Sequence, residues 1–353
     1  MLADLVDHVI GVDPDRDRIT AVVIDASTKG EVDRIEVAAS PAGYETVVEW
    51  ADGFSEATSR VWSIEGAGSY GAGLCTTLQA EGEWVVEFDH PDSRSDKDGS
   101  KSDGLDAARA GREILGRSRL AIPRSRGPRE GLRTLMVARR GAERARVAAV
   151  NTLKALVVTA PVALREQLRG LTANNLVDKC SRLRPGSDTD VEVAATKQAM
   201  RLVARRIISL AEEIKTIDDQ LESIVEEMAP AVLDEFGVGP VSAAQTIISW
   251  SHPGRCRSEA AFARLAGAAP IEANSGQTQD RHRLSRGGDR HLNRALHTIV
   301  LTRARSHPET RAYISRKVSE GKTPREARRV LKRYVARHLF RLLENPAQPL
   351  DNT

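Results

Sequence analysis

Four carboxylates in the first third of the chain have the spacing of a metal-dependent catalytic site. Asp13 and Glu65 each stand at the end of a short apolar run that predicts a β-strand, and Asp103 and Asp106 lie three residues apart at the start of a predicted helix, on one face of it. Four carboxylates meeting in one place repel one another unless cations neutralise them. Their oxygens suit Mg²⁺ or Mn²⁺, and two such ions can hold the attacking and leaving oxygens of a phosphoryl transfer. The pattern therefore predicts phosphoryl-transfer chemistry at a divalent-metal site.

Each of these acids has an ordinary interpretation when it is taken alone, because surface carboxylates are common and most are simply solvated. Asp15, Asp17 and Asp25 lie nearby, so spacing alone does not single out Asp13. The prediction rests on the joint pattern and on the basic half of the chain that follows it.

A glycine pair later in the chain offers a contact with phosphate. Gly237-Val-Gly239 stands between an apolar residue and a predicted helix, and it looks like the hairpin of a helix-hairpin-helix element. Glycine lets the backbone approach a phosphate closely, and the free N–H groups at a helix start attract the anion. Such a contact does not read base sequence. The alternative is a tight helix–helix turn that uses glycine for its positive φ.

A serine ahead of an arginine cluster offers a nucleophile. Ser275 is followed by Gly276 in a predicted loop, where its hydroxyl could face a phosphodiester. Arginines supply bidentate contacts that hold a phosphate. The cluster consists of Arg281, Arg283, Arg286, Arg290 and Arg294. From the residues alone Ser275 is more often an ordinary turn residue, and nothing favours it over Ser285.

The elements that must position the acids have an α/β order. Apolar and alternating runs predict strands over residues 9–13, 19–24, 32–37, 61–65 and 84–88. One helix is expected between the third and fourth strands, and another follows the glycine-rich turn at 66–73 and reaches about Gln79. Helices resume near Leu105, and the break at 123–128 predicts a domain boundary.

The middle of the chain predicts a coiled coil. Apolar residues recur alternately four and three positions apart, which is the spacing of an a/d seam that packs against another helix, within the chain or between subunits. The seam consists of Val203, Ile207, Leu210, Ile214, Ile217, Leu221, Ile224 and Met228. Pro230 ends this helix.

Composition narrows the classes of function. The chain has 353 residues with a net charge of +3, but acids dominate its first hundred residues and arginines dominate the rest. An acidic front and a basic remainder predict a metal site beside a surface that binds a polyanion. Aromatic residues, at 4%, are too few for base-stacking platforms. The three cysteines have no metal-ligand spacing, and no signal peptide or membrane-spanning run is visible, so we expect a cytoplasmic protein without zinc or disulfides and with no membrane partner.

Three short blocks resemble a known family. Gly11-Val-Asp13, Ser63-Ile-Glu65-Gly-Ala-Gly and Lys101-Ser-Asp103-Gly-Leu-Asp106-Ala look like the three blocks of the DEDD-type insertion-sequence transposases, which are related to the Piv and Moov DNA invertases. The resemblance covers nearly the whole chain, because the C-terminal half is similar to the family's second domain.

The resemblance implies a fold and a set of roles. It implies a ribonuclease-H-like domain, similar to the RuvC resolvase, over 1–122, a helical coiled-coil segment over 123–230, and over 231–353 a mostly helical domain with a helix-hairpin-helix-like element. It also implies that Ser275 is the nucleophile that becomes linked to DNA, that the four acids hold metal near it, and that a structured guide RNA takes part. Recombination needs two duplexes held together, so a dimer or tetramer is expected.

Three other functions remain open at this point. A junction nuclease of the same fold would use the acids and water, and would make Ser275 dispensable. An actin-like kinase also begins with a strand-end Asp and contains glycine-rich turns such as 66–73, but no second phosphate loop follows. A DNA-binding protein without catalysis would leave the acids as surface residues.

Overall fold

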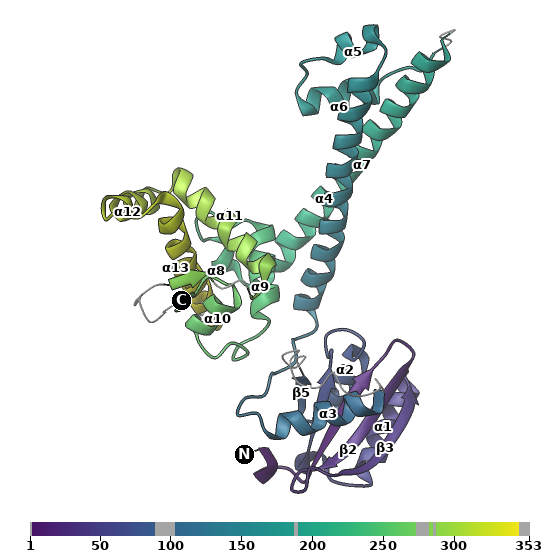
Figure 1. Cartoon of the computed structure of the whole chain (residues 1–353), viewed down its shortest axis with the longest axis vertical. Coiled ribbons are helices and arrows are strands. Elements are labelled where there is room, and N and C mark those ends of the chain that lie inside the picture. The colour runs from purple at the N-terminus through teal and green to yellow at the C-terminus, as the bar shows by residue number, and fades with distance from the viewer. Residues whose placement is uncertain (1, 89–102, 187–189, 273–281, 285–286, 346–353) are drawn as a thin grey trace, which may run out of the picture. The chain divides into compact units, whose positions relative to one another are not determined.

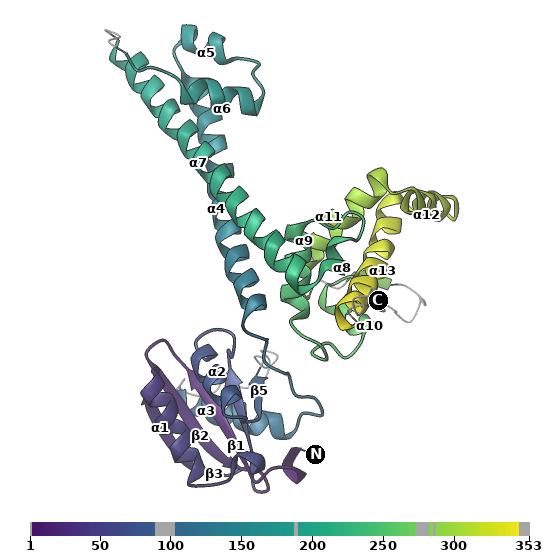
Figure 2. The same ribbon diagram turned by 180° about the vertical axis from the view of Figure 1, so that it is seen from behind.

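The chain divides into two compact units, Met1–Arg126 and Gly127–Thr353. The computed structural model describes residues 2–88, 103–186, 190–272, 282–284 and 287–345 (Figures 1 and 2). No helix among these residues combines the length and apolar character that crossing a membrane requires.

The first unit is built on a mixed five-stranded sheet in the order β3-β2-β1-β4-β5. The strands are β1 (His8–Pro14), β2 (Arg18–Asp25), β3 (Glu31–Ala38), β4 (Arg60–Glu65) and β5 (Val85–Phe88). The first three strands form an antiparallel meander, whereas β4 and β5 run parallel to β1. All five predicted strands are confirmed to within two residues at each end, and the mixed sheet followed by helices is consistent with the expected ribonuclease-H-like fold.

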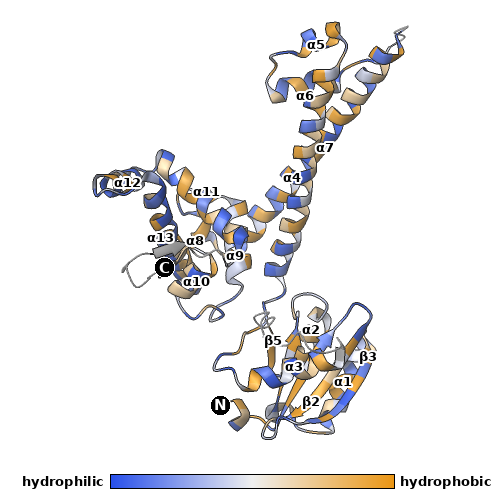
Figure 3. Cartoon of the chain, viewed as in Figure 1, coloured by the Kyte–Doolittle hydropathy of each residue, from blue (hydrophilic) through white to orange (hydrophobic). Residues whose placement is uncertain are grey.

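Helices cover both faces of this sheet. They are α1 (Pro41–Asp52), α2 (Ala72–Ala80) and α3 (Asp103–Leu115), with short 3₁₀ turns at Leu2–Asp4 and Ala57–Ser59. The apolar side chains of α1 and α2 share one core with Ile10, Val12 and Ile64, and those of α3 share the opposite core with Val9 and Val61. Strand β2 is buried on both faces, whereas the edge strand β3 is mostly exposed and hydrophilic, a contrast visible in Figure 3.

A buried ion pair holds the start of β4. The Arg60 guanidinium is almost fully buried and contacts the carboxylate of Glu83, and it also donates to Asp52 Oδ1 at 2.7 Å. Trp62 Nε1 donates to Glu83 Oε2 at 2.8 Å. Burying these charges is tolerated because each is paired and hydrogen-bonded.

The second unit begins with two long helices packed against each other, α4 (Pro128–Thr159) and α7 (Val191–Met228). Leu132 shares a core with Val225, whereas Leu153 shares another with Ile207, so the two helices run antiparallel. The short helices α5 (Val162–Leu168) and α6 (Ala173–Ser181) form the connection between α4 and α7 (Figure 1).

The predicted heptad seam on α7 faces α4. Ile207, Ile214, Ile217 and Leu221 are buried, and the other seam members are half-buried. Beside this seam, Nη2 of Arg139 on α4 donates to Oδ2 of Asp218 on α7 at 3.1 Å. The coiled coil is therefore an intramolecular one between α4 and α7.

The C-terminal helices pack around the end of α7. They are α8 (Pro230–Leu233), α9 (Pro240–Trp250), α10 (Glu259–Leu265), α11 (Arg290–Ser306), α12 (Pro308–Ser319) and α13 (Pro324–Glu344), with a two-stranded sheet of β6 (Pro270–Glu272) and β7 (His282–Leu284). Helix α9 is buried along most of its length, and its last turn is fixed because the buried Arg129 donates to the Ile248 carbonyl at 2.9 Å. The mostly helical character expected of this region is confirmed.

Candidate functional site

Asp13 and Glu65 are neighbours at the carboxyl edge of the sheet. Strands β1 and β4 are parallel and the last paired residues are Val12 and Ile64, so Asp13 and Glu65 occupy the next position of the same register. Side chains alternate along a strand, which places both carboxylates on the face that also bears Gly11 and Ser63. Both residues are half-buried. The structure thus places the ends of these two strands side by side.

Helix α3 lies against that same face in close backbone contact. Ser63 Oγ donates to the Ala110 carbonyl at 2.8 Å, and a Cβ atom at Gly11 would lie 2.0 Å from the Ala107 carbonyl oxygen. Arg112 Nε donates to the Lys29 carbonyl at 3.1 Å, in the turn at the opposite edge of the sheet. The helix therefore runs against β1, and its first turns point toward the edge that carries Asp13.

The two remaining acids lie in these first turns. Asp103 is the first residue of α3, although its side chain lies outside the described residues, and Asp106 is half-buried one turn later. Among the side chains that the structure describes, no group of three or more His, Cys, Asp or Glu side chains is close enough to hold a metal ion. The backbone thus brings the acid-bearing segments to one edge, and carboxylate oxygens are the donors that Mg²⁺ prefers. The four-acid cluster itself stays a prediction.

The glycine-rich turn after Glu65 has a structural role. Its amide groups are used within the turn, because Ser69 N and Gly71 N both donate to the Gly66 carbonyl, at 2.8 and 3.3 Å. A Cβ at Gly71 would lie 2.6 Å from Ile64 Cγ2 and 3.1 Å from Pro14 Cγ. The turn therefore packs onto the ends of β1 and β4, and these two amides are not available to hold a nucleotide phosphate.

The predicted hairpin at Gly237 and Gly239 leads into α9. Gly237 has a φ of +82°, and a Cβ there would lie 3.2 Å from Arg303 Cγ of α11. Gly239 is the N-cap of α9, and its amide donates to Ser242 Oγ at 3.0 Å. Part of the hairpin's hydrogen-bonding capacity is thus consumed internally, and the role of these glycines in nucleic-acid binding stays a prediction.

Glu235 fixes the hairpin to two helices. Its carboxylate accepts from Arg303 Nη2 at 2.7 Å, and its Oε1 lies 2.6 Å from Nε2 of His338 on α13. Burial opposes ionisation, but the contacts with His338 and Arg303 outweigh it and lower the pKa of Glu235.

The predicted serine and most of the predicted arginine cluster belong to the part of the chain whose side chains the structure does not describe. Ser275, Arg281, Arg286 and the alternative Ser285 lie outside the described residues. Arg283 belongs to β7, but its side chain is also outside them. Arg290 and Arg294 are exposed on the first turns of α11.

Asp289, for which no sequence pattern indicated a role, is the N-cap of α11. Its Oδ1 accepts from His291 N at 2.8 Å and from Leu292 N at 3.0 Å, and its Oδ2 accepts from Ser249 Oγ at 2.6 Å. Ser249 Oγ accepts in turn from Gln245 Nε2 at 3.1 Å. An Asp directly before a long amphipathic run is a local signal for a helix start, and it could have identified this cap.

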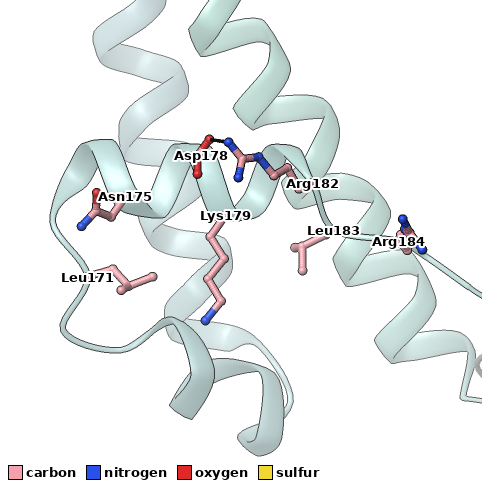
Figure 4. Close-up of a pocket in the computed structure, with 7 residues that line it drawn as sticks. All are labelled: Leu171, Asn175, Asp178, Lys179, Arg182, Leu183 and Arg184. Atoms are coloured by element: carbon pink, nitrogen blue, oxygen red, sulfur yellow. Dashed lines mark ion pairs between the residues drawn. The ribbon is translucent and has the colours of Figure 1, made fainter.

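A shallow pocket lies at α6, near the connection between α4 and α7 (Figure 4). Two of its cations are already engaged, because Arg182 pairs with Asp178 at 2.6 Å and Lys179 Nζ donates to the Gln167 carbonyl at 2.8 Å. We assign no function to this pocket.

Comparisons with known proteins match both units. The sequence profile of the DEDD transposases of IS110 type matches residues 10–160. The profile of the transposase IS116/IS110/IS902 family matches residues 231–315. The first match contains all four predicted acids, and the second contains the hairpin glycines and Ser275. The chain belongs to the IS110 family of DEDD transposases.

Two relatives are proteins of insertion elements. The uncharacterised 43.6 kDa protein of IS110 from Streptomyces coelicolor is 26% identical over 145 residues, which cover 40% of this chain and 36% of the relative. The uncharacterised 42 kDa protein of IS900 from Mycobacterium paratuberculosis is 26% identical over 186 residues, which cover 47% of each chain. The matches therefore span less than half the length of these IS110-family relatives.

Proposed function

We propose that this protein cleaves and rejoins DNA strands during transposition of an insertion element. The observation that carries the proposal is the position of Asp13 and Glu65 at adjoining carboxyl ends of β1 and β4, with the acid-bearing start of α3 directed to the same edge. Family membership supports it, because the two matched regions contain the predicted acids and the predicted serine.

Asp13, Glu65, Asp103 and Asp106 would hold Mg²⁺ or Mn²⁺ in this proposal. A bound divalent cation supplies charge stabilisation for phosphoryl transfer. Asp13, Glu65 and Asp106 are half-buried, and the backbone brings the acid-bearing segments to one edge of the sheet. At Gly11 there is no room for a larger side chain, because the backbone of α3 lies directly against this residue.

Ser275 would be the nucleophile. Its Oγ forms a bond to the phosphorus of a DNA phosphodiester while the bond from phosphorus to one deoxyribose oxygen breaks, and that oxygen leaves as a hydroxyl carrying the proton that the serine gives up. Rejoining reverses the exchange, because a DNA hydroxyl displaces the serine oxygen. No net hydrolysis occurs, so the phosphodiester bond energy is conserved.

Two partners complete the proposal. A structured RNA would pair with donor and target DNA and leave the protein to contact backbone and shape, which fits a chain with many arginines and few aromatic residues. A dimer or tetramer would hold two duplexes together. Equal cleavage with and without RNA transcribed from the flanking region would remove the RNA from this proposal.

Covalent trapping tests the proposal directly. Protein, labelled element-end DNA, flanking RNA and Mg²⁺ are incubated and run on a denaturing gel. We expect an adduct that survives denaturation, disappears in Ser275→Ala and Asp106→Asn, and persists in Ser285→Ala. Asp17→Asn is the matched acid control, because Asp17 is exposed and paired with Arg16 at 2.7 Å. Cleavage without any adduct, still present in Ser275→Ala, would instead identify a water-using nuclease.

A further inference from the structure

A half-buried lysine on α13 lacks a carboxylate partner among the described residues. Lys332 Nζ donates to Asn293 Oδ1 of α11 at 3.0 Å, and no described ion pair includes it. Asn293 is itself oriented, because its Nδ2 donates to the Ala266 carbonyl at 2.6 Å. The ammonium group has three N–H donors, so one contact with a neutral oxygen leaves most of its capacity unused.

The groups around Lys332 are basic: Arg328 and Arg329 are cations, and His297 lies beside them. Burial and the charges of Lys332 and Arg328 lower the pKa of His297, and burial and the charge of Arg329 lower the pKa of Lys332. Like charges gathered in a partly desolvated place destabilise one another. A bound anion would relieve this repulsion, and no described acid forms an ion pair with Lys332, Arg328, Arg329 or His297.

The basic surface continues along α11. Arg290 and Arg294 are exposed on the first turns of the same helix and form no described ion pair. The cations thus extend over several turns of α11, as a polyanion requires and a single small anion does not.

The place of these cations in the fold is specific. Asp289 N donates to the Leu265 carbonyl at 2.7 Å, next to the Ala266 carbonyl that holds Asn293. A Cβ at Gly288 would lie 2.4 Å from the Leu265 carbonyl oxygen. Asn293 therefore links Lys332 by hydrogen bonds to the end of α10. The turn that starts α11 packs against the same end.

We propose that Lys332 and Arg328, here called the α11–α13 cation cluster, bind a backbone phosphate of a nucleic acid, with Asn293 and His297 beside them. This proposal rests on the proposed function, which supplies the nucleic acid. It adds a contact made by residues outside the predicted site. Lys332 would contact the phosphate directly while Asn293 orients it, and the contact would be independent of base sequence.

The experiment measures binding of the full-length protein to a short duplex DNA and to the flanking RNA over a series of salt concentrations. Lys332→Met should weaken binding to unrelated duplexes to the same degree and reduce the slope of log affinity against log salt by about 1, whereas Lys332→Arg should retain the wild-type slope. Lys317→Met is the matched control, because Lys317 is half-buried like Lys332 but already paired with Glu320 at 2.6 Å.

Each outcome decides between the possible roles. A wild-type slope and affinity in Lys332→Met overturns the cation cluster and leaves Lys332 as a structural donor to Asn293. A reduced slope with only one of the two nucleic acids identifies which of them the cluster holds. If Lys332→Met fails to melt cooperatively, Arg328→Gln replaces it, and a wild-type slope in that variant overturns the proposal. Absence of any nucleic-acid binding by the wild-type protein would instead overturn the proposed function.

Discussion

Gly11 shows how tightly a single residue constrains the acidic edge. The space where its Cβ would stand is occupied, at 2.0 Å, by the Ala107 carbonyl oxygen of α3, and Gly111 N would be 2.7 Å away. Because both neighbours are backbone atoms of a packed helix, Gly11→Ala must displace α3 from β1. We expect a loss of about 1–3 kcal/mol or more in the stability of the first unit, measured by denaturant unfolding.

The control for this substitution is Gly116→Ala at the end of α3. A Cβ there would meet only the Glu113 carbonyl oxygen, at 3.8 Å, which is ordinary contact. Its stability should stay within about 0.5 kcal/mol of wild type. Equal effects of the two substitutions would mean that α3 does not press on β1 as described.

The residues that sequence reasoning predicted are those with local signals. Asp13 and Glu65 were predicted because a strand end is visible in the run of apolar residues before it, whereas their adjacency is seen only in the parallel pairing of β1 with β4. Lys332 and Asn293 are 39 residues apart on two different helices, so no periodicity links them. Ser275 stays a prediction that rests on resemblance, because its neighbourhood lies outside the described residues.

Whole elements follow the same rule. The α7 seam was predicted because its heptad spacing is regular from Val203 to the end of the helix. Helix α4 as the partner was not predicted, since its arginines obscure the apolar face that carries Leu132 and Met136. The packing of the hairpin before α9 was missed too, because Glu235 meets Arg303 and His338 only after three helices assemble.

Glu235 makes the attachment of that hairpin dependent on pH. Its pKa in the folded protein is below its ordinary value of 4.5, so the carboxylate stabilises the fold above that value and loses this contribution as pH falls through the lowered pKa. We expect Glu235→Gln to lower stability near pH 7 by about 1–3 kcal/mol, because it removes charged hydrogen bonds.

Thermal melts of both proteins between pH 7 and pH 3 give the measurement. Wild type should lose stability more steeply than Glu235→Gln as pH falls below 4.5. The neighbouring exposed Asp234→Asn serves as control and should follow wild type. Parallel curves for wild type and Glu235→Gln would show that the hairpin does not depend on this carboxylate.

On the scale of the whole molecule, the predicted acids and the predicted serine belong to different compact units. Asp13, Glu65 and Asp106 lie in Met1–Arg126, whereas Ser275 lies within Gly127–Thr353. A catalytic site that needs both can therefore be completed within one chain or between two chains. In the second case, a subunit with intact acids and a subunit with an intact serine would restore a working site when mixed.

We expect complementation in a mixture of Asp106→Asn with Ser275→Ala, each inactive alone. Random assembly of equal amounts makes about half of all dimers mixed. If the site forms between subunits, each mixed dimer contains one site with both functional groups and one with neither, so adduct formation should recover to about a quarter of the wild-type level. If it forms within a chain, every site in the mixture lacks one group and no adduct appears. Titrating the two proteins against each other, with the denaturing gel as readout, distinguishes these cases because recovery between subunits must be greatest at equal amounts.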